Sequence, residues 1–133
     1  MLRAVADTHA IIWYIFNDSR LSDTARNTIE TIANEGNLVG FSAITLAEIV
    51  YLSEKGRIAS TTLDRLLGEV GKKDSVLTEI PFDRHIARAM KNVERMQIPD
   101  LPDRIIAATA LYHDVPLISR DRQILLSSIS TIW

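Results

Sequence analysis

The chain contains no cysteine, which excludes disulfide bonds and thiolate metal sites and fits a reducing compartment. No apolar run reaches the roughly 18–20 residues that a membrane-spanning helix needs. An acid, Asp7, falls where a secretory signal peptide would carry its apolar stretch. We therefore expect a cytoplasmic protein that does not enter a membrane.

Two common kinds of ligand site are also missing from the sequence. The 5 glycines form neither a GxGxxG nor a Walker pattern, and the three histidines (His9, His85 and His113) lack the spacing of an HExxH zinc motif. The formal net charge is −2, so bulk positive charge does not favour nucleic-acid binding. Any such binding must come from a local basic patch.

The hydrophobic pattern predicts a single α/β domain over residues 1–133, of which 47% are hydrophobic. Short apolar strands are expected at residues 3–6, 38–41, 76–80, 116–119 and near 130–133. Helices are expected at residues 8–16, 22–36, 43–55, 60–72, 83–96 and 101–113, with one helical turn at 122–127. This alternation indicates a mostly parallel sheet of four to five short strands between helices, a three-layer α/β/α domain whose strand order is not readable.

Acidic residues recur where this sheet would carry a ligand, at the carboxyl ends of its strands. Asp7 follows the first strand, and Asp121 follows the fourth. Glu48 lies just over one turn into the helix after the second strand. Asp103 begins the helix that runs antiparallel to the fourth strand, so it lies at the same edge. The topology therefore predicts that four distant carboxylates meet.

Each acid also has a simpler explanation when it is taken alone. Asp7 could cap a helix, Asp103 could be a first-turn acid favoured by the helix dipole, and Asp121 could be a turn residue. Glu48 lies in a nearly all-apolar helical run with no Lys or Arg between positions 36 and 54. Burial of its charge requires a partner, either a metal ion or a distant arginine.

Crowded carboxylates raise one another's pKa unless a cation neutralises them. Because the donors are all oxygen, Mg²⁺ or Mn²⁺ fits better than Zn²⁺. The four acids therefore predict a site for one or two such ions, built from carboxylates alone. A response-receiver type of phosphoryl-transfer protein would need paired acids after the first strand and a lysine after the last, and neither is present.

Four segments carry the acids and their neighbours. They are Asp7-Thr8-His9-Ala10-Ile11-Ile12-Trp13, Ser42-Ala43-Ile44-Thr45-Leu46-Ala47-Glu48-Ile49, Asp103-Arg104-Ile105-Ile106-Ala107-Ala108-Thr109-Ala110, and Pro116-Leu117-Ile118-Ser119-Arg120-Asp121. These segments resemble the PIN-domain family, and most closely its VapC-type toxins, over essentially the whole chain. The resemblance implies a PIN-like fold and a metal-dependent endoribonuclease that hydrolyses RNA phosphodiester bonds with one or two divalent ions and acts as the toxin of a toxin–antitoxin pair. It also implies a homodimer and a cognate antitoxin whose C-terminal segment covers the active site.

The resemblance has one departure and leaves two other functions open. Many such toxins carry Asp-Pro-Phe-Asp, often after a His, before the third acid, whereas this chain has Pro99-Asp100-Leu101-Pro102-Asp103 without the His. Asp100 is then expected to support the site from the outer shell. The alternatives are a non-toxin PIN nuclease in RNA processing and a catalytically silent module that binds RNA or protein.

Several further residues are candidates for roles around the acids. Thr8, Ser42 and Ser119 are expected to orient water or phosphate, or to cap a helix or turn. Arg104 and Arg120 flank the acids and are the preferred RNA contacts. Arg84, Arg88, Lys91 and Arg95 form a basic stripe that is better interpreted as a solvated helix face, and Trp13, Tyr14 and Phe16 are better interpreted as core or dimer contacts than as stacking platforms.

Overall fold

The computed structural model describes residues 1–133 and contains one sheet of five parallel strands in the order β3-β2-β1-β4-β5. The strands are β1 (Leu2–Ala6), β2 (Leu38–Ser42), β3 (Leu77–Ile80), β4 (Leu117–Ile118) and β5 (Thr131–Ile132). The predicted fold class and all five strands are confirmed. The strand order shows that the chain first builds outward from β1 to β3 and then returns to the other side of β1.

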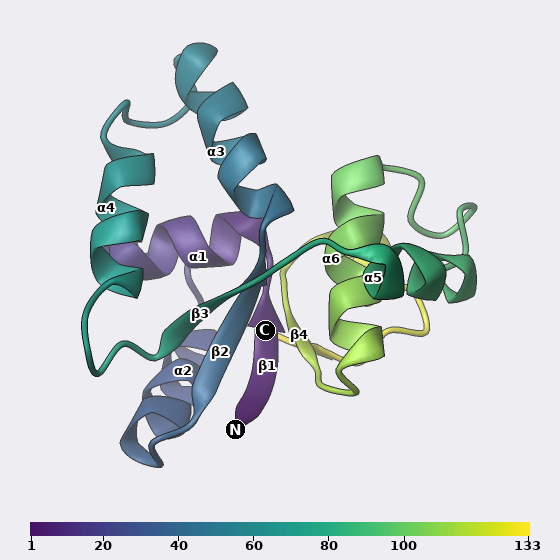
Figure 1. Cartoon of the computed structure of the whole chain (residues 1–133), viewed down its shortest axis with the longest axis horizontal. Helices are drawn as coiled ribbons and strands as arrows, with labels where there is room; N and C mark the ends of the chain where they lie inside the picture. Colours follow the sequence, from purple (N-terminus) through teal and green to yellow (C-terminus); the bar gives the residue numbers. More distant parts are fainter.

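The helices cover both faces of the sheet (Figure 1). They are α1 (Thr8–Ile15), α2 (Asp23–Asn34), α3 (Ile44–Glu54), α4 (Thr62–Val70), α5 (Arg84–Ala89), the short 3-10 helix η1 (Met90–Asn92), α6 (Leu101–Tyr112) and α7 (Arg122–Leu125). The helices α1 to α4 cover one face, and α5 and α6 cover the other. Right-handed crossovers require this change of face when the direction of strand addition reverses.

Two hydrophobic cores hold the three layers together. Successive strand residues point to opposite faces, so Ala4 and Ala6 join the core beneath α1 to α4, whereas Val5 between them joins the core beneath α6. The adjacent residues Leu117 and Ile118 of β4 divide in the same way. Because both faces are buried, the inner parts of the central strands are apolar, as in Ala4-Val5-Ala6 of β1, which is typical of parallel sheets.

One predicted helix, residues 83–96, is wrong in its second half. The α-helix ends at Ala89, a 3-10 turn follows, and Val93 is already extended at φ −102° and ψ 113°. The Arg104 side chain donates to the carbonyl oxygens of Met90 and Val93 at 2.9 and 3.2 Å. This tertiary contact satisfies carbonyls that a continuing helix would have used. Of the apolar residues in this segment, Ile86 and Val93 are buried, whereas Ala87 is exposed.

None of the helices combines the length and the apolar character that crossing a membrane requires.

Gly40, in the middle of β2, is closely surrounded by side chains of the neighbouring strands. A Cβ at this position would clash with the Ile80 side chain and would approach Leu2 Cδ1 to 3.0 Å. We expect Gly40→Ala to lower the free energy of unfolding by about 1–3 kcal/mol through overpacking. The matched control is Gly68→Ala in α4, where no atom lies within 4 Å, and it should stabilise by about 0.5–1 kcal/mol. Urea unfolding of both variants measures the contrast, and equal effects would contradict it.

Candidate active site

Two of the acids flank the point where the strand order reverses. Asp7 directly follows β1, and Asp121 follows β4, which is the neighbour of β1 on its other side. In open parallel sheets the helices diverge to opposite faces at this point and leave a crevice at the carboxyl ends of the strands. The strand order thus places Asp7 and Asp121 at the position where such sheets bind ligands.

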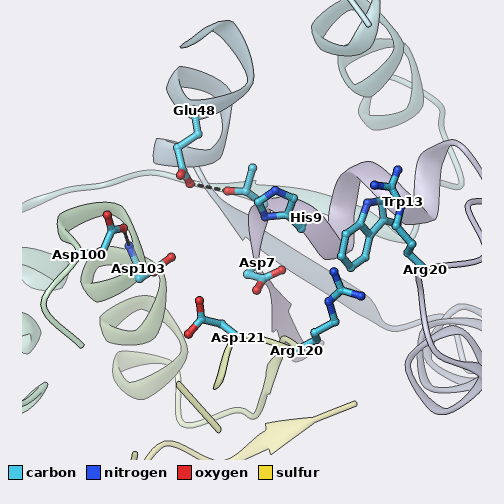
Figure 2. Close-up of a pocket in the computed structure, with 10 residues that line it drawn as sticks. Asp7, His9, Trp13, Arg20, Glu48, Asp100, Asp103, Arg120 and Asp121 are labelled. Carbon is cyan, nitrogen blue, oxygen red and sulfur yellow. Dashed lines mark hydrogen bonds between the residues drawn. The ribbon is translucent and has the colours of Figure 1, made fainter. Parts of the chain in front are cut away.

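The other acids reach the same crevice from two helices. Glu48 lies in the second turn of α3, and Asp103 lies in the first turn of α6, whose N-cap is Asp100. The helices α3 and α6 are also in contact with each other. Figure 2 shows Asp103 and Asp121 pointing into the space in front of Asp7, with Glu48 above them.

Together these residues line a pocket of about 470 Å³. Its ten lining residues are Asp7, Thr8, His9, Trp13, Arg20, Glu48, Asp100, Asp103, Arg120 and Asp121. All four predicted acids and Asp100 are therefore brought together, which confirms their predicted convergence at one edge of the sheet. Five carboxylates face only two guanidinium groups, so the pocket carries a strong excess of negative charge.

Asp7 is the most enclosed acid, with 9% of its surface exposed. Its side chain caps α1 by accepting a hydrogen bond from the Ala10 N–H at 2.9 Å, so the simpler explanation also applies. Burial raises the pKa of Asp7, and hydrogen bonds from the Ser119 hydroxyl and the Ala10 N–H oppose that shift. The Asp7 carboxylate therefore caps α1 and also lines the pocket.

Glu48 is held by a hydroxyl group and not by an arginine. Thr8 Oγ1 donates to Glu48 Oε1 at 2.5 Å and lies 3.0 Å from Thr45 Oγ1. Arg20–Asp18 and Lys72–Glu69 are the chain's two ion pairs, so the alternative of a structural ion pair for Glu48 is wrong. Burial raises the pKa of Glu48, and the bond from Thr8 lowers it, with Asp100 and Asp7 adding to the rise.

Asp103 is the acid whose ionisation the site opposes most clearly. Burial first, and then the charges of Asp100, Asp121, Glu48 and Asp7, raise its pKa from 3.8 to about 7. Each of these influences acts in the same direction. Asp100, by contrast, caps α6 by accepting a bond from the Asp103 N–H at 3.1 Å. A carboxyl group in this setting gains its charge most readily when a cation is bound beside it.

The donor set fits a hard divalent cation. Every potential anionic ligand in the pocket is a carboxylate, which suits Mg²⁺ or Mn²⁺. No three His, Asp or Glu side chains lie close enough together to form a ready-made ligand set for one ion. Mg²⁺ does not need such a cage, because it usually binds one or two carboxylates, keeps several waters and takes substrate phosphate as a further ligand.

The expected supporting residues divide into two groups. Thr8 lines the pocket and holds Glu48. Ser42 and Ser119 are fully buried and bond to local backbone, with their hydroxyls accepting from the N–H groups of Ile44 at 3.2 Å and Asp121 at 3.0 Å. Both serines therefore form turns, which was the alternative expected from the sequence, and the Ser119 hydroxyl also lowers the pKa of Asp7.

The two arginines chosen from the sequence differ in where their side chains lie. Arg120 is exposed and lines the pocket. Arg104 does not line it, because its guanidinium turns toward Met90 and Val93 and its Nε is buried without a partner. Its position corrects the expectation that it faces RNA phosphate. The spacing of a residue from an acid along a helix does not determine which way its side chain turns.

Three pocket residues were not identified from the sequence as site residues. His9 and Trp13 lie on α1 with ring centroids 5.5 Å apart, and Arg20 lies in the following turn. Trp13 is buried, as the sequence suggested, but it also borders the acids. Periodicity indicated only that Trp13 faces inward, and nothing local distinguishes Arg20 from any other loop arginine.

The chain belongs to the PIN domain family, whose family model matches residues 4–128. No curated protein matches the chain significantly.

Solved structures with the same fold include three from bacterial toxin–antitoxin systems. VapBC2 from Rickettsia felis, bound to a DNA fragment from its promoter, has a chain with a TM-score of 0.70 and 19% identity, covering 98% of this chain and 97% of that one. DNA-bound VapBC from Salmonella typhimurium gives a TM-score of 0.68 and 22% identity, with coverages of 98% and 97%. A toxin–antitoxin complex from Klebsiella pneumoniae gives 0.63 and 24%, with coverages of 91% and 89%.

The raised pKa of Asp103 predicts how pH and a divalent ion affect stability. The folded protein holds this proton more tightly than the unfolded chain, so stability without metal should fall as pH rises from about 4 to about 7. Added Mg²⁺ should raise Tm at about pH 8 and have little effect at about pH 5.

The control for this measurement is Asp103→Asn, followed by thermal unfolding across the same pH series. The variant should lose part of the pH dependence and most of the stabilisation by Mg²⁺. An ion effect that is the same at both pH values, or unchanged in the variant, would show that Asp103 is not a ligand.

Proposed function

We propose that this protein is a metal-dependent endoribonuclease that hydrolyses RNA phosphodiester bonds. The observation that carries the proposal is the pocket at the sheet's switch point, where Asp7, Glu48, Asp100, Asp103 and Asp121 outnumber the two arginines. A site of this charge repels a phosphate backbone unless a cation lies between them. Membership of the PIN domain family supports the same interpretation.

The acids have distinct parts in this proposal. Asp7 and Asp103 would be the principal ligands for Mg²⁺ or Mn²⁺, because Asp7 is the most enclosed acid of the pocket and the pKa of Asp103 is raised to about 7. Glu48 and Asp121 complete the ion's surroundings directly or through water. A bound divalent ion supplies a water molecule of lowered pKa and neutralises charge on the scissile phosphate.

The chain's own residues orient the groups that react. Thr8 fixes the Glu48 carboxylate by the 2.5 Å hydrogen bond, so that its second oxygen remains available to a water molecule. Arg120 borders the pocket and is placed to bind the RNA by donating to a backbone phosphate oxygen, apart from the groups that react. In the hydrolysis, water adds to phosphorus, the bond to the leaving ribose oxygen breaks, and that oxygen takes a proton.

We further propose that the nuclease is the toxin of a toxin–antitoxin pair, acting in the cytoplasm. The solved structures of the same fold that support this include DNA-bound VapBC complexes and FitAB bound to a DNA fragment. The partner would be a cognate antitoxin that covers the acidic pocket, and the chain would form a homodimer. A PIN nuclease of RNA processing would share the pocket but would not arrest growth.

Replacing Asp7 by Asn should reduce RNA cleavage at least about 100-fold. Asn retains the helix cap, because its side-chain oxygen can still accept from the Ala10 N–H, so the fold should survive. The assay is cleavage of total RNA with Mn²⁺ or Mg²⁺, with EDTA as the metal-free control.

The matched control for Asp7→Asn is Asp64→Asn, which removes a first-turn acid of α4 outside the pocket lining. This control should cleave like the wild type. Full activity of Asp7→Asn would reject the metal site, and wild-type protein that cleaves no RNA would favour a silent binding module.

Induced expression in a bacterial host separates the toxin from a processing nuclease. Wild-type protein should stop growth within a few generations, whereas Asp7→Asn should not, since the arrest depends on RNA cleavage. Optical density and a total-RNA cleavage map should be followed together. Normal growth despite active RNA cleavage in vitro would point to the processing role.

A further inference from the structure

The charges around the pocket are arranged with a clear polarity. Glu48, Asp100 and Asp103 lie on one side, and Arg20, Trp13 and Arg120 lie on the other, with Asp7 and Asp121 between them (Figure 2). Within the pocket, a polyanion therefore meets guanidinium groups only on the side of Arg20 and Arg120. The arginine side is thus where the backbone next to the cleaved bond can be held.

Both arginines are seated on one aromatic ring. The Cζ atom of Arg120 lies 4.4 Å from the centroid of the Trp13 ring, and that of Arg20 lies 5.2 Å from it. Trp13 itself is 5% exposed and packs against Trp133, with centroids 5.9 Å apart. Contact with a fixed indole restricts two long side chains that would otherwise be mobile.

Arg20 also forms hydrogen bonds with Asp18, an acid that does not line the pocket. Its Nε and Nη2 donate to the two carboxylate oxygens of Asp18 at 3.1 and 2.7 Å. This bidentate pairing lowers the pKa of Asp18 to about 2. The pair fixes the plane of the guanidinium and leaves its other N–H groups free to donate.

The turn that carries Arg20 is itself constrained by the backbone and by a third arginine. Asn17 adopts the left-handed conformation at φ 51°, and the Asp18 N–H donates to the Trp13 carbonyl at 2.8 Å. Arg26 of α2 donates to Asn17 Oδ1 at 2.6 Å and to the Asp18 carbonyl at 3.0 Å. The position of Arg20 beside the pocket is therefore built into the fold.

We propose that Arg20 and Arg120 form a two-arginine clamp that binds a backbone phosphate of the RNA next to the scissile one. Trp13 is the rigid seat of the clamp, and Asp18 is the positioning residue for Arg20. The proposal rests on the proposed ribonuclease function and adds the direction from which the strand enters. Because contacts with Trp13 and Asp18 already restrain these side chains, less side-chain entropy is lost when RNA binds.

The clamp is tested with Arg20→Ala and Arg120→Ala, assayed by cleavage kinetics and by binding of a short fluorescent single-stranded RNA of mixed sequence. Each variant should raise KM and Kd about three- to tenfold while kcat stays within about twofold. The slope of log Kd against log salt should fall by about 0.7 for each phosphate that the variant no longer binds.

Two further variants separate a clamp from general charge attraction. Arg122→Ala removes an equal charge from an exposed residue of α7 outside the pocket lining, and should bind RNA like the wild type. Arg20→Lys keeps the charge but loses the planar fork and should be nearly as weak as Arg20→Ala. Wild-type binding by Arg20→Lys, or equal weakening by Arg122→Ala, would overturn the clamp.

The clamp and the nuclease can fail independently. If Asp7→Asn abolishes cleavage while Arg20→Ala and Arg120→Ala keep the wild-type KM, Kd and salt slope, the clamp is wrong and the nuclease stands. If the wild type cleaves no RNA, the nuclease is wrong, and the fluorescent-RNA binding series still decides whether the arginines hold a phosphate strand.

Discussion

The burial and mutual repulsion of its carboxylates constrain how the pocket of this protein is built. Most of the acids in the pocket have a local hydrogen bond that makes their charge tolerable. Asp7 and Asp121 accept from the first turns of α1 and α7, Asp100 accepts from α6, and Glu48 accepts from Thr8. Asp103 has no such relief, and every resolved influence raises its pKa. The unrelieved repulsion is therefore concentrated at one residue, Asp103.

The order of the strands brings these acids together at one pocket. With β4 next to β1, the acids that follow these two strands face each other across the switch point, and α3 and α6 converge above them. The same reversal splits the apolar residues into two cores, one on each face of the sheet. The reversal of strand order therefore has two effects. It sends the helices to opposite faces, which buries both faces of the sheet, and it leaves a crevice between the diverging helices.

The acids could be predicted from the sequence, whereas the directions of the arginine side chains could not. Asp7, Glu48, Asp103 and Asp121 are tied to the ends of short elements, and their positions follow from connectivity. Arg104 is equally close to an acid in sequence but turns to the carbonyls near the end of η1. Arg20 reaches the pocket only because α1, its capping turn and α2 are packed together. Long flexible side chains take their direction from tertiary neighbours.

The order of residues along the chain was enough to predict the elements, the alternation that makes the sheet parallel, and the edge at which the acids lie. The period of the hydrophobic residues identifies each helix or strand from its own segment. The direction of each strand then gives the end of the sheet at which the following acid lies. The strand order, the early end of α5 at Ala89 and the seating of two guanidinium groups on Trp13 emerged only once the chain was folded. Each of these depends on contacts between distant segments, whose geometry no local pattern encodes.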